Sequence, residues 1–280
     1  MLRLGDGTRL AEVARQAVEL VAPDIVANFD VGIEVHQKSS IFDPVTEIDR
    51  RSERRITDLL NREAPGCTLV GEEYGVHEGA DSGIRWHIDP IDGTLNYVTG
   101  FPYFGVSLGV EVGGELVAGA VRDPVRQETF WADSEHAWLN DAPLAHVSEG
   151  IGIPGVNTMW PYHGAAGGGE AQAELIRLLR GIGMVRAGRS FALQLAHVAA
   201  GRATVAMELD CADSWDIAGG LALAQAVGCT MYALEPNEKS MIPGSGKWAS
   251  PSYVVAHDPG VAARVAAAAS QVLATRKLSE

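Results

Sequence analysis

The segment Trp86–Thr94 constrains this chain more than any other stretch, because an apolar strand here ends in two carboxylates three residues apart. Asp89 and Asp92 are separated by Pro90, which cannot donate a hydrogen bond to a strand ladder and fixes its own φ. Gly93 follows and permits a tight turn. We therefore expect the chain to bend here and to gather both carboxylates toward one point.

Such a bend would suit a magnesium ion. The Ile91 carbonyl would lie beside the two aspartates, and two or three oxygens from one loop match the hard ligands of Mg²⁺, which keeps several waters. The alternative is an ordinary Asp-Pro turn whose Asp-Gly pair caps a helix that begins at Thr94. This segment alone leaves both interpretations open.

A second apolar run, Val70-Gly-Glu-Glu-Tyr74, also delivers adjacent carboxylates at its end. Side chains alternate along a strand, so Glu72 and Glu73 are expected to point in opposite directions. We expect Glu72 to reach a metal shared with Asp89, while Glu73 faces solvent or an arginine. A surface acidic pair is the alternative interpretation.

Thr46 and Asp49 begin a predicted charged helix that runs to about Glu63. With Thr46 as N-cap and Asp49 at the N3 position, a capping-box interaction explains both residues without any function. In the functional interpretation, Asp49 accepts a proton or a hydrogen bond from a partner hydroxyl at the positively polarised helix start. Lys38, in the loop that leads into this helix, is a further site candidate.

Asp216 is predicted to lie in the first turn of a small, apolar helix over 215–226. An acid at this position favours the helix dipole, which would be a purely structural role. However, Ala218, Gly219 and Gly220 remove bulk beside it, as close packing against another element or a ligand requires. The residues alone leave both interpretations of Asp216 open.

The apolar periodicity divides the chain into two parts. Two helices, over 8–29 and 46–63, precede short strands over 67–70, 86–88, 105–112, 115–121 and 128–131. The second half alternates between strands and helices. A Gly/Ala-rich stretch near 145–165 breaks the pattern, so we expect subdomains over 1–145 and 146–280.

Composition limits the possible partners and compartments. The chain has 36 acidic and 22 basic residues and a formal charge of -14, which argues against a nucleic-acid polymer as ligand. Its three cysteines form no C-x-x-C pair and are expected to be reduced. No signal-peptide core and no run of roughly 20 apolar residues occur, which predicts a cytoplasmic location without membrane association. His87 and His197 have no second His or Cys at zinc-ligand spacing.

Taken together, five segments resemble those of the inositol monophosphatase family, in the family's order and roughly its spacing. They are KSSIFDPVTEID, VGEE, WHIDPIDGTLNYVTGFP, GRSFALQLAHVAAGRA and SWDIAGG. The resemblance implies an α/β fold, the αβαβα sandwich of the inositol monophosphatase and fructose-1,6-bisphosphatase type, in which two subdomains meet over the metal site. It also implies hydrolysis of a small phosphate monoester with roughly two or three Mg²⁺ ions per site, and a homodimer.

The resemblance further assigns roles to individual residues. It implies metal-ligand roles for Glu72, Asp89, the Ile91 carbonyl, Asp92 and Asp216. Thr94 and Asp49 would take up the proton of the attacking water, and Glu72 would help to hold the metal that activates it. The backbone N–H groups of Gly93 and Thr94 would bind the phosphate at a helix start.

The resemblance predicts the reaction better than it predicts the substrate. Family members that act on inositol phosphate often carry a Glu seven residues before the Trp-Asp aspartate, and Leu209 occupies this position. Candidate substrate contacts at the rim are Tyr162, His163, Arg189, Ser190, Glu208 and Asp210. Phosphatases of histidinol phosphate, a sugar bisphosphate or a nucleotide 2′- or 3′-phosphate therefore remain alternatives, as does a phosphosugar-binding regulator without turnover.

Overall fold

The computed structural model describes residues 7–31, 35–37, 44–80, 83–144, 155–159, 169–209, 212–235, 238–242 and 248–277. The helices in this part of the chain are α1 (Gly7–Ala27), α2 (Glu47–Glu63), α3 (Thr94–Val98), α4 (Gly169–Ile182), α5 (Phe191–Ala199), α6 (Ser214–Ala226) and α7 (Pro259–Lys277). Lys38, Tyr162, His163 and Asp210, all predicted site residues, lie outside the described residues.

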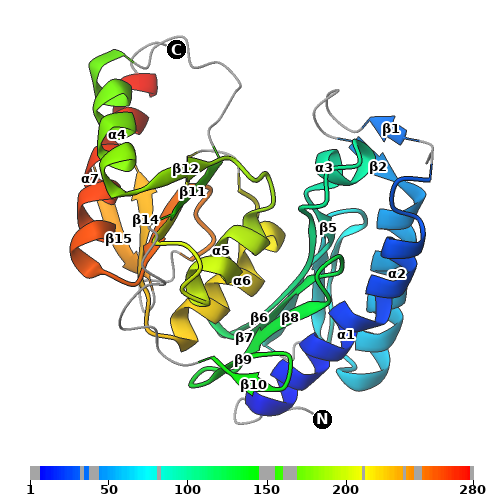
Figure 1. Ribbon diagram of the computed structural model, residues 1–280. Helices are drawn as coiled ribbons and strands as arrows, with labels where there is room; N and C mark the ends of the chain where they lie inside the picture. Colours follow the sequence, from blue (N-terminus) through cyan, green and yellow to red (C-terminus); the bar gives the residue numbers. More distant parts are fainter. Residues whose placement is uncertain are drawn as a thin grey trace.

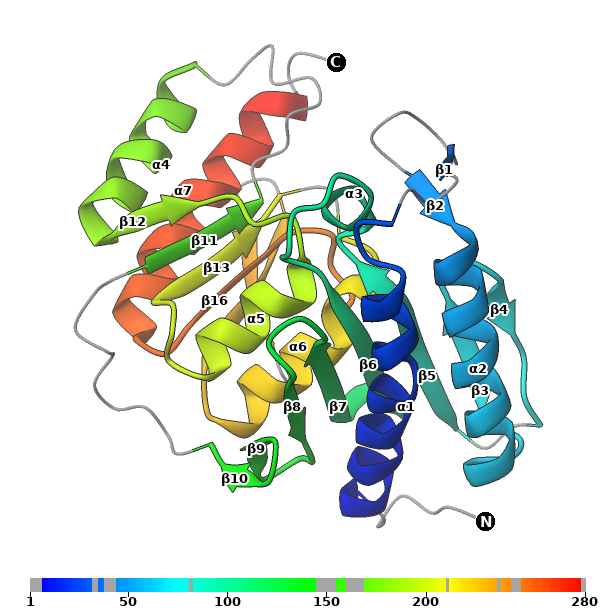
Figure 2. The same cartoon turned by 45° about the vertical axis from the view of Figure 1, so that its right-hand side comes forward.

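Two β-sheets and three helical layers alternate through the molecule (Figures 1 and 2). The layers follow in the order α1 with α2, the first sheet, α5 with α6, the second sheet, and α4 with α7. Three apolar clusters fill the spaces between successive layers. This is the αβαβα sandwich that the resemblance implies, so the predicted fold is confirmed.

The first sheet has the strand order β10-β9-β8-β7-β6-β5-β3-β4. Its strands are β3 (Thr68–Gly71), β4 (Gly75–His77), β5 (Ile84–Asp92), β6 (Gly105–Val112), β7 (Glu115–Asp123), β8 (Glu128–Ala132), β9 (Ala137–Leu139) and β10 (Ala142–Pro143). Only β3 and β5 pair in parallel; the other neighbours in this sheet are antiparallel. The Gly113-Gly114 hairpin joins β6 to β7. A separate two-stranded ribbon, β1 (Val35–Gln37) and β2 (Pro44–Thr46), precedes α2.

The second sheet has the order β12-β11-β13-β16-β14-β15. Its strands are β11 (Gly155–Met159), β12 (Met184–Arg186), β13 (Val205–Glu208), β14 (Thr230–Glu235), β15 (Glu238–Ile242) and β16 (Tyr253–Ala256). The parallel pairs β11–β12 and β11–β13 fit the predicted alternation of strand and helix. After α6 the prediction was incomplete, because β14, β15 and β16 pair antiparallel instead.

Glycines allow α6 to lie directly on the first sheet. A Cβ atom on Gly109 of β6 would stand 2.2 Å from the Ala218 Cβ, and one on Gly119 of β7 would stand 2.7 Å from the Gly219 carbonyl oxygen. Real side chains never approach so closely, so the helix and the sheet fit only because these positions lack a Cβ. A helix from the second half of the sequence is thereby held against the sheet of the first half.

The predicted subdomain boundary at 145/146 falls after β10 and before β11, in a segment outside the described residues. The first sheet is built from residues before it and the second sheet from residues after it. The division into two subdomains stays a prediction. Within the described ranges, no helix is long and apolar enough to cross a membrane.

Candidate metal centre

Strand β5 bends at its carboxyl end. Its pairing with β6 shifts between Asp89 and Asp92, on either side of Pro90, and resumes where Asp92 faces Gly105. The Ile91 N–H donates to the Asp89 carboxylate at 3.0 Å, which closes the bend locally. Both aspartates are buried, with exposed fractions of 2%. The strand therefore continues through the proline, with one more residue on β5 than on β6 across the bend.

Asp92 lies at the amino end of α5. The backbone N–H groups of Phe191 and Ala192 donate to its carboxylate at 3.0 and 2.8 Å, and the Ser190 hydroxyl also donates to it. Ser190 is the N-cap of this helix and is fully buried. The hydroxyl that the sequence places at the substrate rim is thus engaged with Asp92, and a contact between Ser190 and substrate stays a prediction.

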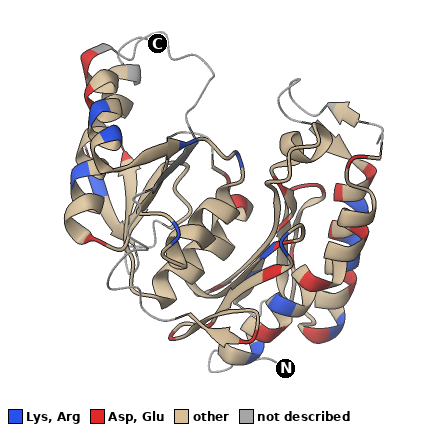
Figure 3. Cartoon of the chain, in the orientation of Figure 1, with Lys and Arg blue, Asp and Glu red and all other residues tan. Residues whose placement is uncertain are grey.

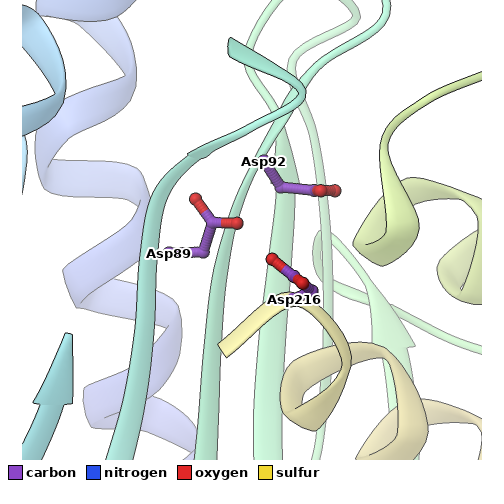
Figure 4. A group of neighbouring side chains, drawn as sticks. All are labelled: Asp89, Asp92 and Asp216. Atoms are coloured by element: carbon purple, nitrogen blue, oxygen red, sulfur yellow. The ribbon is translucent and has the colours of Figure 1, made fainter. Parts of the chain in front are cut away.

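Asp216 comes from the first turn of α6, the helix that packs on the first sheet. It forms a capping box with Asp213, whose backbone N–H donates to the Asp216 carboxylate at 2.6 Å. Figure 4 shows its side chain pointing toward Asp89 and Asp92 across the interface between helix and strand. One carboxylate oxygen from each of the three aspartates lies within 4.8 Å of the others. The structure therefore brings together three of the predicted metal ligands.

The electrostatics of this cluster favour a cation. Burial raises the pKa of Asp89 well above its ordinary value, and the charges of Glu72, Asp92 and Asp216 raise it further. The pKa of Asp216 is raised by burial and then by the charge of Asp92. Several acids with raised pKa values in one place are typical of a cation site, since a bound ion relieves their repulsion. Oxygen donors alone, with no His or Cys among the three, match a hard cation such as Mg²⁺.

Glu72 lies in a turn and not in a strand, which corrects the expectation of alternating side chains. Strand β3 ends at Gly71, and residues 72–74 form the turn into β4. The Glu72 N–H donates to the Ile88 carbonyl of β5 at 3.1 Å, and the pKa of Asp89 is raised partly by a hydrogen bond with Glu72. The turn therefore places Glu72 beside Asp89, as predicted for a shared ligand.

The sequence analysis missed Glu53, which fixes this turn. Its buried carboxylate accepts the backbone N–H groups of Glu73 and Tyr74 at 2.8 and 3.1 Å. A Cβ on Gly71 would stand 1.9 Å from a Glu53 carboxylate oxygen, so a side chain there would displace this carboxylate from the turn. The available signal was helical spacing, since Glu53 shares the buried side of α2 with Ile56.

Thr94 lies between Asp49 and the bend of β5 that carries Asp89 and Asp92. Its hydroxyl donates to the Ile91 carbonyl at 2.9 Å and lies 3.2 Å from an Asp49 carboxylate oxygen. Thr94 is the first residue of α3, whose N-cap is Gly93 with a left-handed φ of 97°, so the threonine hydroxyl does not cap the helix. Burial raises the pKa of Asp49 to about 7.

Asp49 also fulfils its predicted structural role. Thr46 is the N-cap of α2, and a capping box links its hydroxyl and N–H to Asp49. The capping role and the contact with Thr94 use different oxygens of the same carboxylate, because Thr46 donates to one and Thr94 to the other. The two interpretations from the sequence are therefore compatible.

The predicted substrate rim is described only in part. Arg189 has a left-handed φ of 58° directly before α5 and is partly exposed. Glu208 is fully buried at the end of β13, and one of its carboxylate oxygens accepts the Leu209 N–H at 2.8 Å. Leu209 itself is fully buried in the core between the second sheet and its outer helices. Both side chains are therefore buried away from the surface, and a contact between Glu208 and substrate stays a prediction.

Comparisons with known proteins agree with this geometry. The model of the inositol monophosphatase family matches residues 6–274. The chain is 30% identical over 249 residues to an inositol-1-monophosphatase of Caulobacter vibrioides, covering 86% of this chain and 94% of that one.

Two solved structures share the fold across almost the whole chain. The extragenic suppressor protein suhB of Bartonella henselae superposes with a TM-score of 0.80 at 25% identity, covering 94% of this chain and 98% of that one. The inositol monophosphatase of Thermotoga maritima superposes with a TM-score of 0.75 at 26% identity, covering 94% and 97%. The chain therefore belongs to the inositol monophosphatase family, and it is a phosphoric monoester hydrolase.

Proposed function

We propose that this chain hydrolyses a small phosphate monoester, such as an inositol monophosphate, with Mg²⁺ as its metal. The observation that carries the proposal is the convergence of Asp89, Asp92 and Asp216 from both halves of the chain onto one point. Relatives named inositol-1-monophosphatase support this choice of substrate class. A homodimer and a cytoplasmic location are part of the proposal.

The metal ligands in this proposal are Glu72, Asp89, the Ile91 carbonyl, Asp92 and Asp216. Roughly two or three Mg²⁺ ions bound there would lower the pKa of a water molecule and neutralise charge on the phosphoryl and leaving oxygens. The carboxylate of Asp89 would be shared between ions, a role supported by the nearness of both Glu72 and Asp216, whose charges raise its pKa.

Thr94 and Asp49 would receive the proton of the attacking water. A general base works best with a pKa near the working pH, and the pKa of about 7 for Asp49 meets that condition. The Thr94 hydroxyl has one proton and can pass it to Asp49 while it accepts another from water.

Substrate would bind beside the cluster. We propose that the N–H groups of Gly93 and Thr94 hold the phosphate, since the first N–H groups of a helix have no partner within it. Arg189 would assist with its positive charge, and Ser190, Glu208, Asp210 and Lys38 would line the site or support its loops.

A phosphate-release assay tests the proposal. Purified protein would be given inositol 1-phosphate, histidinol phosphate, fructose 1,6-bisphosphate and adenosine 2′- and 3′-monophosphates, each with Mg²⁺ and with EDTA. We expect turnover of inositol 1-phosphate that needs Mg²⁺, and none in the Asp89→Asn variant. Preference for another compound would correct the substrate and keep the chemistry. Binding of Mg²⁺ and phosphosugar without release of phosphate from any compound would instead identify a regulator.

A further inference from the structure

The metal cluster is assembled across an interface. Asp89 and Asp92 belong to β5 of the first sheet, whereas Asp216 belongs to α6 from the second half of the chain. A shift of α6 along the sheet would move Asp216 and leave the other two aspartates in place. The distance from Asp216 to Asp89 and Asp92 therefore depends on the contacts that fix the amino end of α6.

A hydrogen-bonded chain of three side chains lies at that point. His87 of β5 contacts the Ser214 hydroxyl through Nδ1 at 2.9 Å and the Glu111 carboxylate of β6 through Nε2 at 3.1 Å. His87 and Ser214 are 127 residues apart in the sequence, and each stands two residues before a cluster aspartate. These hydrogen bonds thus join the two segments that supply Asp89 and Asp216.

Elementary chemistry fixes the direction of the hydrogen bond to Glu111. A carboxylate can only accept, so Nε2 of His87 carries the proton that is donated to Glu111. Nδ1 meets the Ser214 hydroxyl, which can both donate and accept. Glu111 therefore orients the His87 ring, as in the carboxylate–histidine pairs that orient metal ligands.

The surroundings hold this arrangement in one geometry. The His87 side chain is 5% exposed, and the edge of its ring meets Trp248, with ring centroids 4.9 Å apart. The Ser107 hydroxyl of β6 donates to the Trp215 carbonyl at 3.3 Å, a second link between the sheet and the start of α6. A buried ring in contact on several sides has few alternative rotamers.

We propose that His87, together with Glu111 and Ser214, is a positioning residue that sets the place of Asp216 in the metal cluster. The inference rests on the proposed metal centre. In it, His87 acts on Asp216 through Ser214 and does not contact the substrate. Loss of the His87–Ser214 hydrogen bond would leave the fold intact and loosen the amino end of α6. Metal affinity would therefore fall more than stability does.

Direct metal binding tests this inference. Mn²⁺ would serve as the probe, with its dissociation constant measured by electron paramagnetic resonance in the absence of substrate and thermal unfolding followed in EDTA. His87→Leu and Ser214→Ala should each raise the Mn²⁺ dissociation constant about tenfold. The double variant should be little worse than either single one, because the two residues act in one chain.

Two further variants separate positioning from general stability. His257→Leu is the matched control, because His257 also bridges elements, with Nε2 donating to the Val198 carbonyl at 2.9 Å, but at the far end of α5 from Asp92. It should lower the unfolding temperature and leave Mn²⁺ affinity unchanged. His87→Gln keeps a donor and an acceptor and should recover much of the affinity.

The outcomes are distinguishable from failure of the proposed function. Wild-type protein that binds no Mn²⁺ would refute the metal centre itself. Wild-type binding with unchanged affinity in folded His87→Leu and Ser214→Ala would overturn the positioning role alone. If His87→Leu fails to fold, Ser214→Ala, which removes a single oxygen, decides the question.

Discussion

Two groups of carboxylates in this protein have opposite electrostatic surroundings. On the helices α1 and α2 and at the start of β8, acids lie beside arginines, as in Asp24 with Arg51 and Glu128 with Arg202, and both signs of charge mix along α1 and α2 (Figure 3). In the metal centre, no described Arg or Lys side chain forms an ion pair with Asp89, Asp92 or Asp216.

The pKa values follow this difference. The hydrogen bond from Arg202 lowers the pKa of Glu128, whereas burial and neighbouring acids raise the pKa values of Asp89 and Asp216. A lowered pKa means that the charged acid stabilises the fold, and a raised pKa means that it destabilises the fold. The protein thus compensates the charge of one group itself, and we propose that a cation compensates the charge of the other group.

The largest expected effect comes from Asp89→Asn. Loss of a shared ligand should reduce turnover by a factor of about 10³ or more, since charge stabilisation is usually the largest catalytic term. In EDTA the same variant should unfold at an equal or higher temperature than wild type, because a repelling charge is gone. Steady-state kinetics and thermal unfolding measure the two effects. A variant that keeps a tenth of wild-type turnover would rule out Asp89 as a shared ligand.

The next effect concerns Thr94 and Asp49, which touch the centre without being predicted metal ligands. Thr94→Ala and Asp49→Asn should each lower kcat by a factor of roughly 10²–10⁴, the usual range for general-base assistance. Mg²⁺ affinity should change little, because the pair acts in the transition state. Asp49→Asn should also lose some stability, since it weakens the capping box of α2.

Thr99→Ala is the matched control for this pair. Thr99 ends the same short helix, and its hydroxyl donates to the Leu95 carbonyl at 2.7 Å, so its loss perturbs α3 without touching Asp49. Its kcat should remain close to that of wild type. The Thr94→Ala, Asp49→Asn double variant should match the worse single variant, and kcat losses that multiply instead would show that the two residues act independently.

The sequence predicted the parts of this centre that depend on local chemistry. The apolar periodicity predicted α2 and β6, and Pro90 and Gly93 predicted the bend between Asp89 and Asp92. The metal-ligand role of Asp216 was predicted from the family resemblance. Asp216 lies far from Asp89 and Asp92 in the sequence, so local patterns could not show that the three side chains meet. Local rules also placed Thr46 and Asp49 in a capping box, which the structure confirms.

The parts that the sequence did not predict depend on distant partners. Glu53 acts on a turn 20 residues away, and His87 meets Ser214 across 127 residues, so neither contact has a periodic signal. The extent of β5 was underestimated because its ladder resumes beyond Pro90, which only the partner strand reveals. The turn at Glu72 was taken for strand because the apolar run before it does not mark where pairing ends.

The smallest expected effect belongs to the ion-paired group. The two terminal guanidinium nitrogens of Arg202, Nη1 and Nη2, donate to Glu128 at 2.5 and 2.7 Å, and the Arg202 and Glu128 side chains are 29% and 21% exposed. A partly exposed bidentate pair of this kind stabilises a fold by about 1 kcal/mol. Glu128→Gln should lower the free energy of unfolding by that amount at pH 7 and leave kcat and Mg²⁺ affinity unchanged, because this pair neither bends β5 nor reaches α6.

The stability lost in Glu128→Gln should depend on pH in one direction. Because the folded-state pKa of Glu128 is lowered from 4.5, its contribution is present above that pH and disappears as the pH falls through the folded value. Urea unfolding at pH 7 and at successively lower pH values below 4.5 should therefore show the two proteins converging in acid. Arg202→Gln should give the same convergence, since it removes the other half of the pair. A Glu128→Gln variant more stable than wild type at pH 7 would place Glu128 with the repelling carboxylates of the centre and remove the distinction between the two groups.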